Sequence, residues 1–445
     1  MPDLDRIADK KLASHVVDGG RLRALVLELW QRTRMDWGFV TDRLAQTFRK
    51  ETWIGAHERR FVGETLYGLV RHLRRVDAAL DRGRRGTKRA PRDLERLLAV
   101  LVLDRLIDPA RARQLEPELD WNAVAGIDEA IAGERKAAAR IALAASLPDW
   151  LAQRFVADWG ERAERLALAL NERAPMTVRA NLLIGDRAAL VAELARAEMT
   201  TRAGAWSDTA VIIESRTNLF ALDAFKRGAL ETQDEGSQLL ADLATANVRG
   251  KPFIIDLCAG AGGKTLAIAA RLANQGRILA TDIDGKKLEE LRRRARRAGV
   301  SNAQAITLDG GAWPVALDAQ RNKADVVFVD APCSGIGALR RNPEARWRLR
   351  ESDLADLARR QREIVTNAAN LLAPGGRLVY GTCTLLAEEN ADVVDAVLAA
   401  RPELSRVPLP EVLGERAAQL GGDTFTVAPD THGTDGFFAA ILRRS

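Results

Sequence analysis

Residues 253–265 read FIIDLCAGAGGKT, an apolar run followed by a glycine-rich turn. Residues 253–257 predict a buried strand, and a helix is expected to begin at Lys264. Glycines at such a turn let backbone N–H groups approach a ligand at a helix N-terminus, where the helix dipole favours negative charge. The pattern therefore predicts the first strand, turn and helix of a nucleotide-binding α/β fold.

The residues that follow repeat this alternation of strand and helix. Four more strands are predicted by the apolar runs at 277–281, 303–308, 324–329 and 377–380. A long helix is predicted over 285–298. Continuous apolar strands that alternate with helices are typical of a parallel sheet covered on both faces. We therefore expect residues 241–445 to form a doubly wound, Rossmann-like α/β domain.

The first 240 residues have a different pattern. Helical periodicity at 21–31 and 61–80 predicts an all-α domain over residues 1–140. A small α/β module is predicted over residues 145–240, from strand-like runs at 176–184 and 210–213 and a helix at 187–197. The chain is thus expected to have three domains.

Composition limits the class of protein and its surroundings. Apolar residues make up 47% and charged residues 29% of the 445 residues, as in ordinary globular chains. Cys258, Cys333 and Cys383 are too few for a disulfide framework, which favours a reducing cytoplasm. No apolar run reaches the roughly 18 residues of a membrane span. We expect a cytoplasmic protein without membrane association.

Basic residues are clustered along the chain, whose formal net charge is +6. The clusters lie at 82–92 (RGRRGTKRAPR), at 292–297 (RRRARR), and at Arg340, Arg341, Arg346, Arg348 and Arg350. Such clusters suit a phosphate-rich partner, because each neutralised phosphate releases condensed counterions. Solvated arginine-rich helices account for the same clusters equally well. The sequence leaves both interpretations open.

The glycine-rich turn is compared with three kinds of ligand site. A phosphate-binding P-loop needs glycine at position 258, which is cysteine. A nicotinamide or flavin site needs glycine at position 265, which is threonine. An S-adenosylmethionine site is favoured, because aspartates also follow the next three strands at the edge of the sheet where ligands bind. These aspartates are Asp282, Asp309 and Asp330.

Two cysteines are predicted to lie at that same edge. Cys333 follows the fourth strand in DAPCSGIG (330–337), and Cys383 follows the fifth in YGTCT (380–384). A thiolate that attacks carbon 6 of cytosine makes carbon 5 nucleophilic, so that carbon 5 can accept a methyl group. Asp330 is placed to hydrogen-bond the base and stabilise the charge that develops. Which of the two thiols attacks stays open from these residues alone.

Five motifs resemble those of the Nop/Sun family of RNA cytosine-5 methyltransferases. They are RAPMTVRAN (173–181), QDEGSQL (233–239), DLCAGAGGKT (256–265), DAPCSGIG with RNPEARW (330–337 and 341–347), and YGTCTLLAEEN (380–390). The helical N-terminal part resembles the antitermination-factor-like, RNA-binding domain of the family's 16S rRNA cytosine-5 methyltransferase B branch. The resemblance implies methyl transfer from S-adenosylmethionine to carbon 5 of a cytosine in RNA.

The resemblance also implies roles for individual residues. In that family the cysteine after threonine is the nucleophile and the cysteine after proline assists product release, which implies these roles for Cys383 and Cys333. The residues implied to contact or border the cofactor are Cys258, Ala259, Gly260, Ala261, Gly262, Gly263, Lys264, Asp282, Asp309 and Asp330. Many members have alanine and proline at the positions of Gly260 and Ala261, so we expect an altered loop rigidity here. No metal site is expected.

The partner is expected to be RNA. The branch resemblance favours 16S rRNA, with tRNA as the alternative. A non-catalytic RNA-binding ribosome-assembly factor is the alternative from another class, and the intact Asp330, Cys333 and Cys383 argue against it. A methyltransferase of proteins or small molecules is disfavoured by the basic clusters and the two upstream domains. We expect a monomer with no obligate protein partner, and we expect Trp347 to pack under the active-site loop rather than stack on RNA.

Overall fold

The computed structural model describes residues 3–84, 89–215, 217–310 and 313–445. Their contacts divide the chain into two compact units. The helical unit comprises the residues up to 172 together with 339–351, and the α/β unit comprises 173–338 and 352–445. The chain therefore leaves the α/β unit at residue 338, contributes a short segment to the helical unit, and returns at residue 352.

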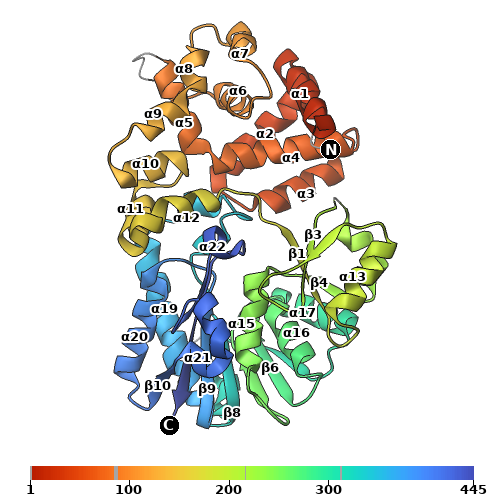
Figure 1. The fold of residues 1–445 in the computed structure, drawn as a ribbon, viewed down its shortest axis with the longest axis vertical. Helices are drawn as coiled ribbons and strands as arrows, with labels where there is room; N and C mark the ends of the chain where they lie inside the picture. Colours follow the sequence, from red (N-terminus) through yellow and green to blue (C-terminus); the bar gives the residue numbers. More distant parts are fainter. Residues whose placement is uncertain (1–2, 85–88, 216, 311–312) are drawn as a thin grey trace. The chain divides into compact units, whose positions relative to one another are not determined.

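Helices alone build the helical unit in the part of the chain that the structure describes (Figure 1). They are α1 (Asp3–Asp18), α2 (Gly20–Asp36), α3 (Val40–Lys50), α4 (Ala56–Arg71), α5 (Leu73–Gly83), α6 (Asp93–Leu103), α7 (Pro109–Leu115), α8 (Trp121–Ala125), α9 (Ile127–Ala132), α10 (Ala137–Ala144), α11 (Asp149–Trp159), α12 (Ala163–Ala169) and α18 (Ala345–Arg348). The single helix predicted over 61–80 is divided at His72. The backbone N–H of Arg74 in α5 donates to Ser146 Oγ at 2.8 Å, a distant partner that local periodicity does not reveal.

The segment 339–351 is packed into the core of the helical unit. Arg346 has no exposed surface, and its Nη1 donates to Ala145 O at 2.9 Å and to Asn171 Oδ1 at 2.8 Å. Trp347 Nε1 donates to Val70 O at 2.7 Å. Its ring centroid lies 6.0 Å from that of Trp37. Trp347 thus packs, as expected, but in the helical core rather than under the active-site loop.

The α/β unit begins with a small antiparallel sheet of strand order β2-β3-β1-β4. Its elements are β1 (Met176–Ala180), α13 (Arg187–Arg196), β2 (Thr201–Ala203), β3 (Ala210–Ile213), α14 (Asp223–Lys226) and β4 (Leu230–Thr232). Val178, Val211 and Leu230 face its core and are fully buried. The strand predicted over 176–184 ends earlier, because a turn follows Ala180.

The larger sheet has the order β10-β12-β9-β8-β5-β6-β7, and β11 pairs with β12. Its strands are β5 (Phe253–Asp256), β6 (Arg277–Asp282), β7 (Ala303–Thr307), β8 (Ala324–Asp330), β9 (Leu372–Thr382), β10 (Leu404–Val407), β11 (Phe425–Val427) and β12 (Phe437–Arg444). The five strands β5 to β9 are parallel. β12 runs antiparallel to β9 and β10, so the sheet is mixed rather than wholly parallel.

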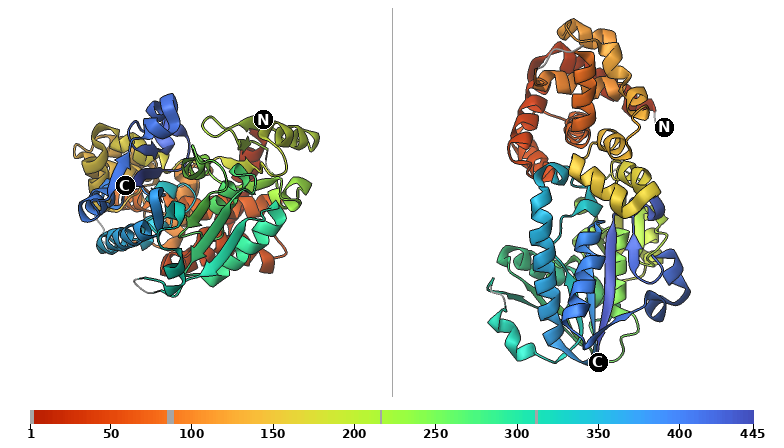
Figure 2. Two further views of the ribbon diagram at one scale, coloured as in Figure 1. Left: turned by 90° about the horizontal axis from the view of Figure 1, so that it is seen from below. Right: turned by 90° about the vertical axis from the view of Figure 1, so that its left-hand side faces the viewer.

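Helices cover both faces of this sheet (Figures 1 and 2). The helices are α15 (Glu235–Thr245), α16 (Gly263–Arg271), α17 (Gly285–Ala298), α19 (Glu351–Ala368), α20 (Ala391–Ala400), α21 (Leu409–Leu413) and α22 (Pro429–His432). α19 and α20 pack on the face that carries Ile255 and Val327, and α15 and α16 on the face that carries Ile254 and Val326. This confirms the predicted doubly wound α/β fold. None of the described helices is both long and apolar enough to cross a membrane.

Candidate active site

The strand order of the large sheet creates a crevice between β5 and β8. From β5 the chain continues to β6 and β7 on one side, whereas β8 and β9 lie on the other. The loops that leave adjacent strands in opposite directions open a crevice at the carboxyl edge of a doubly wound sheet, where ligands bind. Residues 258–263, here called the glycine loop, follow β5, and residues 331–335, the Cys333 loop, follow β8.

The glycine loop is held by β6. Ala259 N donates to Thr281 O at 2.9 Å, and Gly260 N donates to Asp282 Oδ2 at 2.8 Å. Gly262 has a φ of 85° and precedes α16. A Cβ at Gly262 would lie 2.5 Å from Leu291 Cγ of α17, so only glycine fits this turn. Gly260, in contrast, faces open space and also has a positive φ, of 53°.

Two arginines brace the loop by bonding its carbonyl oxygens. Arg179 of β1 donates to Gly263 O at 3.2 Å, and Arg294 of α17 donates to Ala261 O at 2.8 Å. Glu231 of β4, which is 2% exposed, accepts from Arg294 at 2.9 Å and from Arg297. Arg294 and Arg297, both members of the basic cluster at 292–297, therefore hold the loop and the small sheet in place.

A cation–carboxylate pair spans the crevice. Lys264 Nζ donates to Asp330 Oδ2 at 2.6 Å. Burial opposes the charge of Lys264, but the Asp330 carboxylate outweighs it and raises the pKa of the ammonium above its usual value. The negative charge of Cys383 adds to this increase. Lys264 thus stays a cation, with Asp330 and the sulfur of Cys383 both within its electrostatic reach.

The floor of the glycine loop carries two groups with raised pKa values. Burial is the main cause for Asp256, whose pKa rises to about 7, and a hydrogen bond from Thr265 Oγ1 at 2.6 Å only partly offsets it. Burial and the carboxylates of Asp256 and Asp330 raise the pKa of the Cys258 thiol as well. Cys258 therefore stays a thiol, which fits a residue that lines the loop rather than one that attacks a substrate.

The two remaining thiols meet at the carboxyl edge. Cys333 Sγ and Cys383 Sγ lie 3.3 Å apart, although 50 positions separate them in sequence. Both residues are partly exposed. The hydrogen bond to Cys383 and burial raise the pKa of the Cys333 thiol, and the charge of Glu389 adds to the shift. The thiols therefore occupy unequal surroundings, with a carboxylate near Cys333 and an ammonium near Cys383.

Most of the predicted site residues come together at this edge. The glycine loop, Lys264, Asp282 and Asp330 surround the crevice between β5 and β8, beside the two thiols. Asp309 is the exception: it lies two residues beyond β7 and is exposed. Among the described residues, its side chain bonds to none of the other candidates.

Sequence reasoning missed four polar residues that hold the Cys333 loop and residues 383–386 after β9, which together are here called the two thiol loops. Ser334, Gln361, Glu389 and Asn390 are bonded to each other or to residues adjacent to the cysteines. A signal was present for Gln361, because it lies on the buried stripe of α19 between Ala358 and Val365. A polar residue on an apolar helical stripe needs a buried partner.

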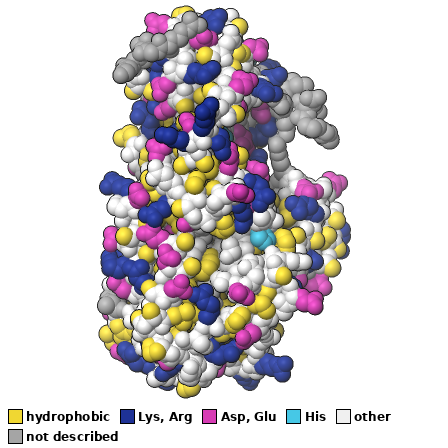
Figure 3. Space-filling view, turned by 60° about the vertical axis from the view of Figure 1, so that its left-hand side comes forward, with side chains coloured by type: hydrophobic (Ala, Val, Ile, Leu, Met, Phe, Trp, Pro, Cys, Tyr) yellow, Lys and Arg dark blue, Asp and Glu magenta, His cyan; other side chains and the backbone are white. Residues whose placement is uncertain are grey.

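Arginines of the other two basic clusters also form contacts within the protein. Arg84 and Arg92 bond to Glu95, which has no exposed surface; residues 85–88 of that cluster lie outside the described residues. In the third cluster Arg340 is 4% exposed and Arg346 fully buried, whereas Arg348 and Arg350 are exposed, so only part of this group lies on the surface. On the face drawn in Figure 3, Lys and Arg side chains are interspersed with Asp and Glu.

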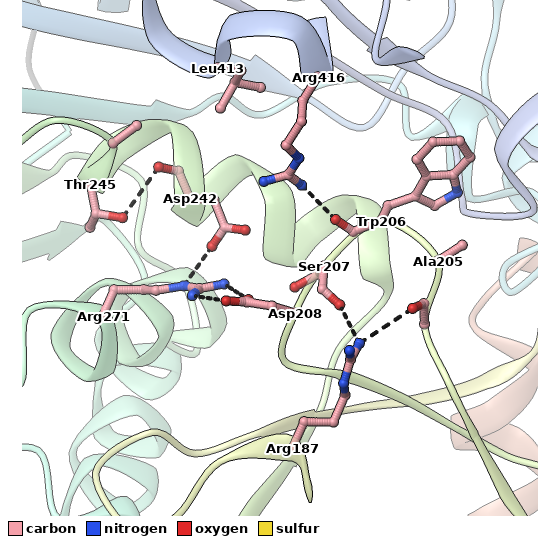
Figure 4. Close-up of a pocket in the computed structure, with 12 residues that line it drawn as sticks. Arg187, Ala205, Trp206, Ser207, Asp208, Asp242, Thr245, Arg271, Leu413 and Arg416 are labelled. Atoms are coloured by element: carbon pink, nitrogen blue, oxygen red, sulfur yellow. Dashed lines mark hydrogen bonds and ion pairs between the residues drawn. The ribbon is translucent and has the colours of Figure 1, made fainter.

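A cavity of about 470 Å³ lies elsewhere in the α/β unit. Arg271 bonds both Asp208 and Asp242 there, while Arg187 and Arg416 donate to carbonyl oxygens of the loop around Trp206 (Figure 4). These bonds join the small sheet to the large one. The cavity contains no residue of the glycine loop or of the two thiol loops.

The crevice fits S-adenosylmethionine. The open space at Gly260 leaves room for a ligand against the loop backbone, and the Asp282 carboxylate at the end of β6 is placed for ribose hydroxyl groups. No group of three or more His, Cys, Asp or Glu among the described residues could hold a metal ion. The fold and this site define a methyltransferase that uses S-adenosylmethionine.

Comparison with known proteins gives the family. The profile of the 16S rRNA methyltransferase RsmB/F family matches residues 244–443, and that of its ferredoxin-like domain matches 147–219. A probable ribosomal RNA small subunit methyltransferase B of Synechocystis sp. is 30% identical over 87% of this chain and 92% of its own length. The chain belongs to the RsmB/F family of 16S rRNA methyltransferases, within the Nop/Sun group, and its cofactor is S-adenosylmethionine.

Solved structures support the same fold. The structure of PH0851 matches 94% of this chain and 97% of its own, with a TM-score of 0.74 and 24% identity. A methyltransferase homologue from Pyrococcus horikoshii matches 68% of this chain and 98% of its own, with a TM-score of 0.59 and 25% identity. The first match extends through both units.

Proposed function

We propose that this protein methylates carbon 5 of a cytosine in small-subunit ribosomal RNA, with Cys383 as the nucleophile. The observation that carries the proposal is the 3.3 Å separation of the Cys333 and Cys383 sulfurs beside the Lys264–Asp330 pair. A methyltransferase that acts on an amine or a hydroxyl group has no chemical need for two thiols. Methyl transfer to the unreactive carbon 5 needs one thiol, because that carbon must first be activated covalently, and a second thiol beside it can assist breakage of the resulting C6–S bond.

The residues of the site support a covalent mechanism of methyl transfer. Cys383 Sγ forms a bond to carbon 6, and the π electrons of the C5=C6 bond move toward carbon 5. Asp330 holds the amino group or the protonated ring nitrogen of the base. S-adenosylmethionine supplies the methyl group that carbon 5 accepts. Methyl transfer leaves S-adenosylhomocysteine; transfer of the carbon-5 proton to water then re-forms the C5=C6 double bond, and the C6–S bond breaks with Cys383 leaving as a thiolate.

The unequal surroundings of the thiols support the division of roles. Lys264 lies within electrostatic reach of Cys383, so the sulfur proposed to attack carbon 6 has a cation close to it. Cys333, whose pKa is raised, keeps its proton and does not compete for carbon 6. Its sulfur is close enough to that of Cys383 to assist release of the methylated RNA.

The RNA is assigned from the relatives. The Synechocystis protein and others that match this chain carry the name ribosomal RNA small subunit methyltransferase B. The target cytosine must be unpaired or flipped out of its helix, since carbon 6 is inaccessible within a stacked duplex. Bisulfite sequencing of RNA from cells with and without the gene identifies the position, and a new mark in tRNA instead of rRNA would contradict the substrate.

Two cysteine variants test the mechanism. Cys383→Ala should lose methyl transfer to rRNA by at least about a thousandfold, in the range lost with other covalent nucleophiles, while S-adenosylmethionine still binds. Cys333→Ala should instead accumulate a denaturant-resistant protein–RNA band, because the adduct forms but is released slowly. Cys258→Ala serves as the thiol control and should form no such band. Methylation by Cys383→Ala at the wild-type rate would disprove the role of that residue.

A further inference from the structure

A buried carboxylate brackets the Cys333 loop. Glu389 has no exposed surface. Its Oε1 accepts from Ser334 N at 2.8 Å, and its Oε2 accepts from Ser334 Oγ at 2.5 Å. Gln361 Nε2 donates both to Glu389 Oε1 at 3.0 Å and to Pro332 O at 2.9 Å. Glu389 therefore holds the residues on both sides of Cys333, one directly and one through Gln361.

The next residue in the chain does the same for the other cysteine. Asn390 Oδ1 accepts from Thr382 Oγ1 at 2.6 Å, and Asn390 Nδ2 donates to Thr384 O at 3.2 Å. The residues on both sides of Cys383 are thus bonded to one side chain. Ser334 Oγ and Thr384 Oγ1 lie 2.8 Å apart and connect the hydrogen bonds around Cys333 to those around Cys383.

The backbone fixes Glu389 in this position. Tyr380, fully buried in β9, donates its hydroxyl to Glu389 O at 2.6 Å. Gly337 N donates to Cys383 O at 2.9 Å, and a Cβ at Gly337 would meet Gly436 O at 2.1 Å. The two thiol loops are therefore packed backbone to backbone. Their spacing follows from two consecutive side chains and this close approach.

We propose that Glu389 is a positioning residue of the methyl-transfer reaction, which acts through Cys333 by holding its loop against Cys383 and by keeping the Cys333 sulfur protonated. The geometry supplies the first effect. The second is electrostatic, because a carboxylate that cannot reach water disfavours a second negative charge nearby. It agrees with the raised pKa of Cys333, to which Glu389 contributes. The proposal deepens the proposed function and rests on it for the role of Cys333.

The variant Glu389→Gln removes the charge of this side chain but keeps nearly the same shape. Glutamine keeps an acceptor for Ser334 N and offers its amide to Ser334 Oγ, so the loop stays in place while the charge is lost. Iodoacetamide labelling of the RNA-free protein across pH, with site-resolved mass spectrometry, follows each cysteine separately. The labelling midpoint of Cys333 should fall by about one pH unit, which is about tenfold faster labelling below the midpoint. Cys383 should shift less.

Two controls define the outcome. Glu411→Gln removes a carboxylate that is 55% exposed and far from the thiols in the fold, and it should shift neither midpoint. Ser334→Ala removes one bond to Glu389 but keeps the charge, so the Cys333 midpoint should not fall. An unchanged or raised Cys333 midpoint in Glu389→Gln, with S-adenosylmethionine binding intact, would overturn the proposal.

Turnover distinguishes this proposal from the proposed function. With rRNA, Glu389→Gln should accumulate the covalent RNA adduct several-fold over wild type, as Cys333→Ala does. If neither variant forms an adduct, the covalent mechanism fails while the labelling result still measures the effect of Glu389 on Cys333. If only Cys333→Ala forms one, Glu389 does not act through Cys333 in the reaction.

Discussion

Asp256 lies at the end of β5 with no exposed surface, and the two oxygens of its carboxyl group differ in their contacts. Oδ2 accepts from Thr265, whereas Oδ1 has no hydrogen-bond partner among the described residues. Protonation relieves the cost of burying this charge, which is why the pKa of Asp256 rises to about 7. A side chain at the base of the cofactor site therefore changes its charge near neutral pH.

This raised pKa gives a prediction for stability. The folded protein binds a proton at Asp256 that the unfolded chain, with a pKa of about 3.9, releases. The contribution of Asp256 to the free energy of unfolding is therefore fully present below pH of about 4, decreases as pH rises toward 7, and is level above it. Asp256→Asn should remove this dependence.

Urea unfolding of both proteins between pH 5 and 8 measures the effect. From pH 5 to pH 8 the free energy of unfolding of Asp256→Asn should rise relative to that of the wild type, on the order of 2–4 kcal/mol. Asp208→Asn, at a carboxylate that is 69% exposed, serves as the control and should show no such gain. A constant difference between Asp256→Asn and wild type would show that Asp256 is ionised throughout.

At the scale of single residues, the sequence predicted which side chains lie at the carboxyl edge of the sheet but not which residues hold them there. Asp282, Asp330, Cys333 and Cys383 were found because each follows an apolar strand, and parallel strands end at one edge. Glu389 follows no strand, and the partners of its carboxylate, Gln361 and Ser334, lie 28 or more positions away in sequence. No local pattern reports such a contact.

Among the elements, the turn between β5 and α16 limits the cofactor site. Gly260 and Gly262 both have positive φ values, but only Gly262 is enclosed, by Leu291 and Leu266. The two glycines therefore serve different purposes: Gly262 lets α16 pack against α17, and Gly260 leaves space beside the loop.

Alanine at each position should separate the two purposes. Gly262→Ala adds left-handed strain and a clash with Leu291, and should lower the free energy of unfolding by about 2–4 kcal/mol. Gly260→Ala should cost only about 1 kcal/mol but weaken S-adenosylmethionine binding. Thermal unfolding and calorimetric titration measure the two effects. Equal loss of stability in both variants would contradict the assignment.

The parallel part of the large sheet was predictable because each strand is an apolar run followed by a helix. β12 was not predicted, although residues 437–442 (FFAAIL) are buried. A short apolar run buried on both sides does not distinguish strand from helix by periodicity. β12 also pairs with β9 and β10, so its neighbours in the sheet are set by the completed fold.

On the scale of the whole molecule, the predicted domain boundaries did not anticipate that the chain crosses between its units. Residues 339–351 lie within the sequence of the α/β unit but belong to the helical unit. Arg346 anchors them as a buried guanidinium to which no carboxylate of the described residues is bonded, and burial lowers its pKa to about 9. The sequence showed an arginine cluster there and gave no sign of its burial.

Arg346→Ala should therefore destabilise the helical unit. The change leaves Asn171 Oδ1 without its donor, removes one of the two donors to Ala145 O and creates a cavity, which together cost about 3 kcal/mol or more. Arg359→Ala removes an arginine that is 52% exposed in α19 and should cost less than about 1 kcal/mol. Thermal unfolding monitored by tryptophan fluorescence distinguishes the two. Equal melting temperatures would show that Arg346 is dispensable.

The position of residues 339–351 in the sequence has a consequence for how the protein folds during its synthesis. Translation delivers α1 to α12 first, whereas Trp347 and Arg346, which donate to Val70 O and Ala145 O, emerge only after β8 and the Cys333 loop have been synthesised. A nascent helical unit is therefore incomplete until much of the second unit has left the ribosome. We therefore expect the core of the helical unit to be completed only once residues 339–351 have been made, so that the two units mature together rather than in succession.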